Sequence, residues 1–388
     1  MYVTKCTFLL KTILLCTLFL PLTACWSSIS IQDQLYISAM GIDYKDEQFT
    51  IYAQMFDFNS ISRSEGGARS SPEESTFIGK GYGKTMNQAV FNMYQTSQEH
   101  VEWGHMGAVV VTAKAMEQLG STIVERLYRS PSTRYNTWLY VTEEPIEQIF
   151  ATASFFNMTS LFTILHNPTG NYEQNSIFPP TLMFKYIVNS NENDRIIYVP
   201  CIGINNSAWL QSDKPIGVLT VKGAYFESSA KETGLFKREQ LKGIQWLDEK
   251  FNRVTLTVQN EETAYANLTI FQPKIKVKPL LKNGEVKFKI TAKYQAIMQE
   301  YIEEISYEEL VKLAEDQVKK EIMSIYTLGI ENKLDLYSLM HPFRMKYPKQ
   351  WVTMTDRGDN FILNENSIES LDVHIRIPSN GKYKRRIQ

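Results

Sequence analysis

Histidine side chains are the first candidates for catalysis or metal binding, and this sequence contains five. His100 and His105 lie in the segment EHVEWGH, among nearby glutamates. A zinc pair on a helix needs ligands three or four residues apart on one face, whereas these two are five apart, with Gly104 between them. The spacing therefore favours polar residues at a helix-to-strand turn. Three further histidines each stand alone in the sequence: His166, His341 and His374.

The glycine-rich segment GKGYGKT, residues 79–85, resembles a phosphate-binding loop ahead of a helix. A P-loop needs its first glycine five positions before the Gly-Lys-Ser/Thr group, and Ile78 occupies that place. A strand-to-helix turn is the better interpretation. Since no other catalytic motif occurs either, we expect no catalytic residues, no metal site, no cofactor and no enzymatic activity.

The N-terminal segment has the pattern of an export signal. Lys5 and Lys11 are its only charges before Cys25, and the apolar stretch from Ile13 to Leu20 is interrupted by Pro21. A helix that spans a bilayer needs about 20 apolar residues, so this stretch is too short. The pattern predicts a cleaved signal peptide over residues 1–24. A buried N-terminal helix is the alternative.

Cys25 is the one residue to which we assign a chemical role. Leu22, Thr23 and Ala24 precede it, which matches the bacterial lipobox of Leu, two small residues and Cys. A thiol at a membrane surface can be alkylated by a diacylglyceryl donor, and a peptidase then cuts before it. Two acyl chains, at ~0.8 kcal/mol per buried CH₂, supply on the order of 20 kcal/mol of gross membrane affinity. We therefore predict lipidation at Cys25 and a lipidated tether over residues 25–34.

The other cysteines support this assignment. Cys6 and Cys16 leave with the signal, so only Cys201 remains and no intrachain disulfide can form.

The formal net charge is −1, and it falls to about −3 when the signal lysines leave, which argues against non-specific nucleic-acid binding. The one basic cluster, Lys382 to Arg386, is either a solvated terminus or a contact for lipid headgroups or a partner.

The 388 residues exceed what one core usually serves, so several domains are expected. An N-terminal α/β domain over 35–195 is predicted from strands that alternate with helices. Its strands are expected at 35–43, 48–56, 75–81, 104–112 and 137–142. Its helices are expected after Thr85, in two stretches around 113–129, and from residue 144. Residues 59–75 read as a loop, and the polar, Pro/Asn-rich residues 166–200 as loops leading to a new unit.

Two further domains complete the predicted mixed α/β, α+β fold. A small middle α+β domain, 196–270, has strands at 218–227 and 253–259 around a helical stretch at 238–250. The C-terminal domain, 271–388, combines a hairpin at 273–298 that turns at Asn283-Gly284 with a helix over 306–328 and a closing strand within 361–378. The helix has a capping box at Ser306 and Glu309, and Gly329 is expected to end it. Glu303, Glu304 and Glu308 lie near its start and complement its dipole.

An ordered set of motifs resembles the Ger(x)C family of spore germination lipoproteins across nearly the whole mature chain. The matches are Cys25-Trp26, Gly41-Ile42-Asp43, the helix entry with Gly81, Gly83, Thr85 and Ala89, His105 before an apolar strand, Arg129-Ser-Pro, VKGAYFE, LKGIQWLDE, YPKQW and the closing strand. The family usually has Asp or Asn after the Cys-Trp pair, where this chain has Ser27.

The resemblance implies a three-domain protein on the outer face of the spore inner membrane, the C subunit of a nutrient germinant receptor. It implies two integral-membrane partners, the A-type and B-type subunits, and no catalytic residues. A lipid-anchored solute-binding protein that captures the germinant itself is the alternative, and it calls for a deep interdomain cleft. A cell-wall hydrolase is a third hypothesis, but it needs a convergent catalytic site that the sequence does not show.

Overall fold

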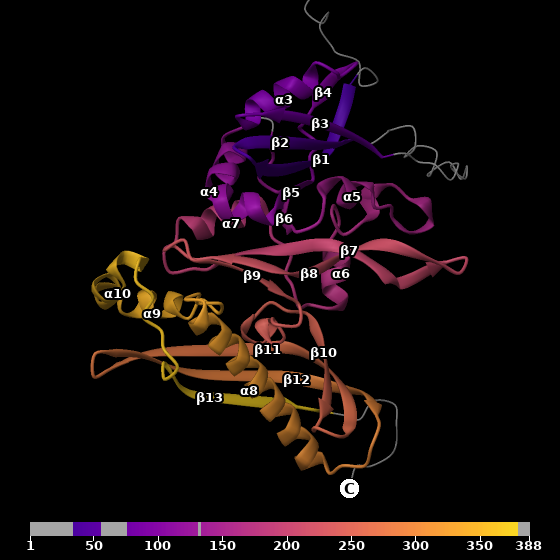
Figure 1. Cartoon of the computed structure of the whole chain (residues 1–388). Coiled ribbons are helices and arrows are strands. Elements are labelled where there is room, and N and C mark those ends of the chain that lie inside the picture. Colours follow the sequence, from indigo (N-terminus) through magenta and orange to yellow (C-terminus); the bar gives the residue numbers. More distant parts are fainter. Residues whose placement is uncertain (1–33, 56–75, 131–132, 379–388) are drawn as a thin grey trace, which may run out of the picture.

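The computed structural model describes residues 34–55, 76–130 and 133–378. Within these ranges the chain forms two β-sheets covered by helices, with the N-terminal strands in the upper sheet of Figure 1 and the C-terminal strands in the lower one. The predicted mixed fold, in which sheets pack against helices, is confirmed. The predicted signal peptide and tether, the loop at 59–75 and the basic run at 382–386 lie outside the described residues, apart from Gln34 at the tether's end.

The larger sheet is mixed. Its strands are β1 (Gln34–Lys45), β2 (Gln48–Met55), β3 (Phe77–Gly83), β4 (His100–Glu102), β5 (Ala108–Thr112), β6 (Trp138–Thr142), β7 (Ile197–Gln211), β8 (Lys214–Glu227) and β9 (Thr233–Lys237). They follow the order β3-β2-β1-β5-β6-β7-β8-β9, and β4 pairs with β1. β5 is parallel to both β1 and β6, and β6 is parallel to β7, while β1–β2–β3 and β7–β8–β9 are antiparallel.

The β1–β2 hairpin confirms the first two predicted strands. Its turn residues Asp46 and Glu47 both have left-handed φ angles, 51° and 59°. A two-residue turn of this kind matches the right-handed twist of the flanking strands. The charged turn therefore sets the register that places Ile42 opposite Ile51 in the core.

Helices cover both faces of the larger sheet. They are α3 (Met86–Tyr94), α4 (Ala113–Arg129), α5 (Ile146–Ala151) and α7 (Met183–Ser190), with 3₁₀ turns at Phe155–Asn157 and Ser160–Phe162. The short helix α6 (Thr169–Gln174) instead contacts β10 (Arg253–Gln259) of the second sheet. Val109 and Val111 pack in the core that α3, α4 and α7 share. Val110, between them, packs in a second core with Ile149 and Phe150 of α5. This alternation follows from the opposite directions of successive strand side chains.

Three predictions about helices and loops between residues 113 and 250 were wrong. The two helical stretches around 113–129 are one helix, α4. The supposed loops at 166–200 contain α6 and α7, because Met183 and Tyr186 of α7 are buried against the sheet despite the polar composition around them. The helical stretch at 238–250 holds only a 3₁₀ turn, Ile244–Leu247, since Gly243 before it has a left-handed φ of 112°.

The second sheet contains β10 (Arg253–Gln259), β11 (Ala264–Lys282), β12 (Glu285–Tyr301) and β13 (Ile368–Arg376), in that order. The helix α8 (Tyr307–Glu331) packs along one of its faces (Figure 1) and buries a stripe of side chains: Leu310, Ala314, Val318, Ile322 and Ile325. Ser306 caps α8 as predicted, and its hydroxyl accepts a hydrogen bond from the Glu309 amide. Two short helices follow, α9 (Met340–Lys346) and α10 (Pro348–Thr355), and then a 3₁₀ turn at Asp356–Gly358.

Gly329 does not end the long helix, which continues to Glu331 with Asn332 as its C-cap. A Cβ atom at Gly329 would lie 2.4 Å from the Leu334 carbonyl oxygen. The glycine is therefore required by the chain that folds back over the helix.

Residues 196–270 form no sheet of their own. β7, β8 and β9 extend the larger sheet, whereas β10 and the start of β11 belong to the smaller one. A shared core joins these parts to the C-terminal helix, through Phe226 and Phe236 on one side and Ile325 and Leu334 on the other. The three-domain division stays a prediction, and the part of the chain that the structure describes forms two sheets.

None of the helices in the described ranges is long and apolar enough to cross a membrane.

Candidate functional site

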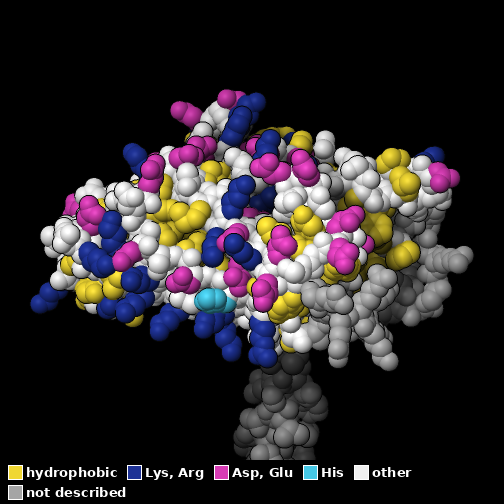
Figure 2. Space-filling model, turned by 90° about the horizontal axis from the view of Figure 1, so that it is seen from below, with side chains coloured by type: hydrophobic (Ala, Val, Ile, Leu, Met, Phe, Trp, Pro, Cys, Tyr) yellow, Lys and Arg dark blue, Asp and Glu magenta, His cyan; other side chains and the backbone are white. Residues whose placement is uncertain are grey.

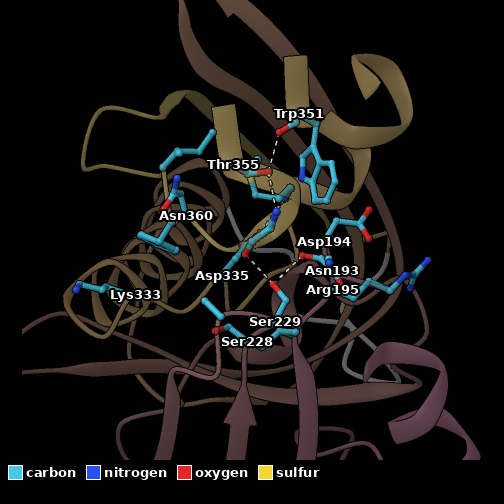
Figure 3. Close-up of a pocket in the computed structure, with 16 residues that line it drawn as sticks. Asn193, Asp194, Arg195, Ser228, Ser229, Lys333, Asp335, Trp351, Thr355 and Asn360 are labelled. Atoms are coloured by element: carbon cyan, nitrogen blue, oxygen red, sulfur yellow. Dashed lines mark hydrogen bonds between the residues drawn. The ribbon is translucent and has the colours of Figure 1, made fainter. Parts of the chain in front are cut away.

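A small pocket lies where the two sheets meet, and three segments far apart in the sequence line it. These segments are the turn before β7, the turn after β8, and the chain that follows α8 (Figure 3). Its cavity volume is about 60 Å³, whereas small-molecule sites typically have about 300–1,000 Å³. The pocket is therefore too small to enclose a ligand of ordinary metabolite size.

The carboxylate of Asp194 is the centre of the polar contacts beside this pocket. Its side chain is 0% exposed, and it accepts hydrogen bonds from Arg344 Nη1 at 2.7 Å and His341 Nδ1 at 2.8 Å. Arg344 Nη1 also donates to Glu192 at 2.8 Å, and its guanidinium lies over the ring of Trp351. A buried carboxylate needs such partners, because an unpaired charge loses its hydration without compensation.

His341 bridges two charged groups of opposite sign. Its Nδ1 faces Asp194, and its Nε2 lies 2.9 Å from Nη2 of Arg195. A guanidinium only donates, so Nε2 must accept and the ring proton must lie on Nδ1. The neutral ring satisfies both contacts, whereas a doubly protonated ring would direct an N–H group at Arg195.

Asp335, which is partly buried, adds a second carboxylate to the pocket lining. Burial raises the pKa of Asp335 to about 6, while backbone hydrogen bonds, among them one of 2.7 Å from the Met340 amide, act in the opposite direction. The negative charge of Asp194 also raises the pKa of Asp335. Asp335 therefore holds the start of α9 in place beside the Asp194 contacts.

The other side of the pocket is closed by backbone contacts. The Asn193 side chain donates to the Arg357 carbonyl at 2.8 Å, and the Ser229 hydroxyl lies within 3.0 Å of the carbonyls of Asn193 and Gly358 (Figure 3). Gly358 has a φ of 105°, and a Cβ there would lie 2.7 Å from the Asn193 carbonyl oxygen. Glycine is needed for the two segments to approach this closely.

These contacts hold the two sheets together. Ser229 bonds to carbonyl oxygens, and the hydroxyl of Thr355 donates to the Trp351 carbonyl, so neither has a general base as partner. A nucleophilic site needs such a base within hydrogen-bond reach. The polar side chains here bind the three segments to each other. The arrangement is therefore that of a structural contact between the sheets and not of a reaction centre.

The histidines of the sequence analysis have different surroundings. His100 is in the exposed strand β4, and the ring of His105 packs edge-on against Tyr36. No group of three or more His, Cys, Asp or Glu side chains in the described ranges could hold a metal ion. His166 Nε2 contacts Gln54 Oε1 at 2.9 Å, and burial lowers the pKa of His166 to about 4. His374 is on β13.

His341 is the residue that sequence reasoning missed. It stands alone in the sequence because Asp194, its partner, is 147 residues away. No spacing rule connects such positions, and only the joining of the two sheets brings them together.

The glycine-rich segment at 79–85 forms the turn from β3 into α3, as predicted. Cβ atoms at Gly81 and Gly83 would lie 2.1 Å from the Ala89 carbonyl oxygen and 2.5 Å from its amide nitrogen. Thr85 caps α3 by accepting a hydrogen bond from the Gln88 amide, while the Gln88 side chain accepts one from the Lys84 amide. The glycines thus allow the helix to lie close to the strand.

Cys25 lies outside the described residues, so its lipidation stays a prediction. Cys201 is buried in β7 as a free thiol, and burial raises its pKa to about 12. A thiol with so high a pKa is unreactive near neutral pH.

Two family profiles match this chain, and the second begins within β8 of the larger sheet. The family profile described as "Spore germination protein N-terminal domain" matches residues 27–204, and that described as "Spore germination B3/ GerAC like, C-terminal" matches residues 222–380. The crystal structure of the GerBC protein aligns with a TM-score of 0.52 at 13% identity, over 88% of this chain and 97% of that one. This likeness shows a shared fold. No curated protein is a significant match.

Proposed function

This chain belongs to the Ger(x)C family of spore germination receptor subunits, and we propose that it acts as a non-enzymatic, membrane-anchored subunit of a nutrient germinant receptor. The observation that carries the proposal is that two spore germination profiles match in the family's order and together span most of residues 27–380. The contacts of Asp194 with His341 and Arg344, which we call the polar joint between the sheets, support the proposal. These side chains bind each other and leave little room for a substrate.

The anchor in this proposal is a diacylglyceryl group on Cys25. The lipobox residues Leu22, Thr23 and Ala24 support it, and the chain would then lie on the outer face of the spore inner membrane. We expect Cys25→Ala to leave unprocessed precursor without fatty-acid label, whereas Cys16→Ala, a matched change within the signal, keeps the label. Labelling of Cys25→Ala equal to that of the unchanged protein would contradict the proposal.

The partners in this proposal are the two integral-membrane receptor subunits, of the A and B types. Affinity capture of the tagged full chain from detergent-solubilised spore membranes tests this. We expect to recover two polytopic proteins with the chain. As a control, they should be missing when the membranes come from spores that lack the genes of the other subunits. Recovery of the chain alone after chemical cross-linking would count against a receptor complex.

Direct capture of the germinant is the competing function. Titration of the mature chain with amino acids, sugars and nucleosides, followed by calorimetry, separates the two. The 60 Å³ pocket leads us to expect no binding. Micromolar binding of one of these compounds, lost when the pocket residue Ser229 is changed to Trp, would favour a solute-binding role instead.

A further inference from the structure

The face of the smaller sheet opposite α8 carries a concentration of positive charge, which we name the cationic face. It consists of Lys274, Lys276 and Lys278 on β11, Lys289 and Lys293 on β12, and Arg376 on β13. All are exposed, and they alternate with residues such as Ile275 and Ile290 that point to the α8 side. In the view from below, Figure 2 shows Lys and Arg side chains along the lower edge of the coloured surface, with some Asp and Glu side chains beside them.

The strand register places like charges directly opposite each other on this face. Lys274 pairs with Lys293, and Lys278 pairs with Lys289. Like charges at opposed positions of neighbouring strands destabilise a sheet. The chain as a whole has a formal charge of −1, so this concentration is a local feature and does not reflect a basic protein.

Acidic side chains offset only part of this charge. Asp372 is exposed on the same side of β13, opposite Thr291. Glu369 forms its close ion pair with Lys282 and a longer one, 3.7 Å, with Lys289. Among the described residues, Lys274, Lys276, Lys278 and Lys293 form no ion pair. Their charges therefore remain available to an anionic surface outside the chain.

Protection of a sheet edge does not explain these lysines. Lysines on edge strands prevent strands of other molecules from pairing, and the part of β11 beyond residue 273 is such an edge. Lys289 and Lys293, however, lie on β12, which is paired with β11 on one side and with β13 on the other. Lysines at these central positions cannot serve to prevent pairing with a strand of another molecule, because both neighbouring strands are already paired.

We propose that the cationic face docks on a membrane surface rich in anionic phospholipid headgroups. The proposal rests on the proposed function for the lipid anchor that brings the chain to a membrane. Lysine ammonium groups are flexible point charges that suit a diffuse anionic surface, whereas specific carboxylate or phosphate recognition favours arginine forks.

A lipid chain and a basic surface strengthen each other's binding to a membrane. Once one of them is bound, the other is held close to the bilayer and loses less translational entropy when it binds. Docking through this face would fix the orientation of the smaller sheet against the bilayer. The anchor alone leaves that orientation open, since it holds the chain to the membrane at only one point.

The experiment uses the full lipidated chain reconstituted in vesicles of phosphatidylcholine alone or of phosphatidylcholine with phosphatidylglycerol. An amine-acylating reagent and mass spectrometry give the modification rate of each lysine. We expect the rates of Lys274, Lys276 and Lys278 to fall about fivefold in the anionic vesicles, and high salt to restore them. Lys114 on α4 and Lys231 in the turn after β8 are both exposed and outside the smaller sheet, so they are internal controls whose rates stay unchanged.

A pair of variants completes the test. In Lys276→Glu/Lys293→Glu we expect Lys274 and Lys278 to lose their protection, whereas Lys114→Glu/Lys231→Glu keeps it. Equal rates in both kinds of vesicle, or protection that appears only with added acidic protein or nucleic acid, would overturn the proposal. Flotation of the vesicles reports the anchor separately, so a chain that floats but shows unprotected lysines refutes the docking and not the anchoring.

Discussion

At the scale of single residues, the decisive group is the buried carboxylate of Asp194. It is held by Arg344 and His341, and these three side chains connect the turn before β7 to helix α9. Removing one partner of a buried ion pair leaves an uncompensated charge, which costs more than the pair contributes when intact. The joint between the sheets is therefore sensitive to single substitutions.

Arg344→Met tests this joint. The methionine keeps the aliphatic contact with Trp351 but removes both hydrogen bonds to carboxylates, so we expect a loss of about 2 kcal/mol in the free energy of unfolding. Urea titration measures it. Arg129→Met is the matched control, because its pair with Glu125 has the arginine side chain 76% exposed and contributes below about 0.5 kcal/mol. Equal effects of the two substitutions would contradict the role of Asp194.

His166 predicts the pH dependence of stability. Burial lowers its pKa from 6.5 to about 4 in the folded state. The unfolded chain therefore binds a proton in the range where the folded chain does not, and stability is lost as the pH falls from 6.5 towards 4. Between pH 6.5 and pH 4 we expect the free energy of unfolding of His166→Gln to fall by about 2 kcal/mol less than that of the unchanged protein. Urea titrations at the two ends of this range measure it, and His374→Gln, exposed on β13, is the control.

At the scale of elements, the helix α3 shows why the glycine motif exists. The sequence pattern alone resembles a phosphate-binding loop. In the structure, Gly81 and Gly83 lie where the backbone of α3 approaches β3 closely. A cradle for an anion and a close helix–strand contact both require residues without a Cβ, so composition cannot separate them. The packing of Ala89 against β3 does.

Gly81→Ala is the corresponding test. A Cβ at this position would lie 2.1 Å from the Ala89 carbonyl and 2.9 Å from the Met93 Cβ, and overpacking of this kind costs about 3 kcal/mol. The melting temperature and the urea midpoint should both fall. Gly170→Ala meets no atom within 4 Å and lies in a short helix, so it should be neutral or slightly stabilising. An unchanged midpoint for Gly81→Ala would show that α3 can move without cost.

At the scale of the whole molecule, the two sheets share a core. Phe226 of β8 packs with Phe236 of β9 and with Ile325 of α8. A core built from both units makes their folding interdependent, because neither can expose its part without losing the contacts of the other. This shared core and the polar contacts of Asp194 therefore connect the two sheets.

Phe226→Ala tests the coupling. Its side chain is 1% exposed, and we expect a loss of about 4 kcal/mol in the free energy of unfolding. Hydrogen exchange should accelerate for amides of β12 in the smaller sheet as well as for those of β5 in the larger one. Phe91→Ala, at a position 68% exposed, is the control. Faster exchange confined to the larger sheet would mean that the sheets unfold independently.

The sequence by itself determined much of the local structure and the family. Alternating apolar residues predicted the closing strand β13, the Asn283-Gly284 turn predicted the long hairpin, and the capping residues Thr85 and Ser306 predicted the starts of two helices. These signals are local, since each depends on residues within one turn or one strand. The ordered motifs, taken together, were also sufficient to indicate the family.

Only the tertiary structure decided where distant residues meet. α7 is helical because its apolar face is buried by α4 and β7, which the Pro/Asn-rich composition around it does not reveal. The pairing of Asp194 with His341, and the alignment of lysines on β11 with lysines on β12, follow from the packing and the strand register. Such contacts join residues through space, and spacing along the chain carries no record of them.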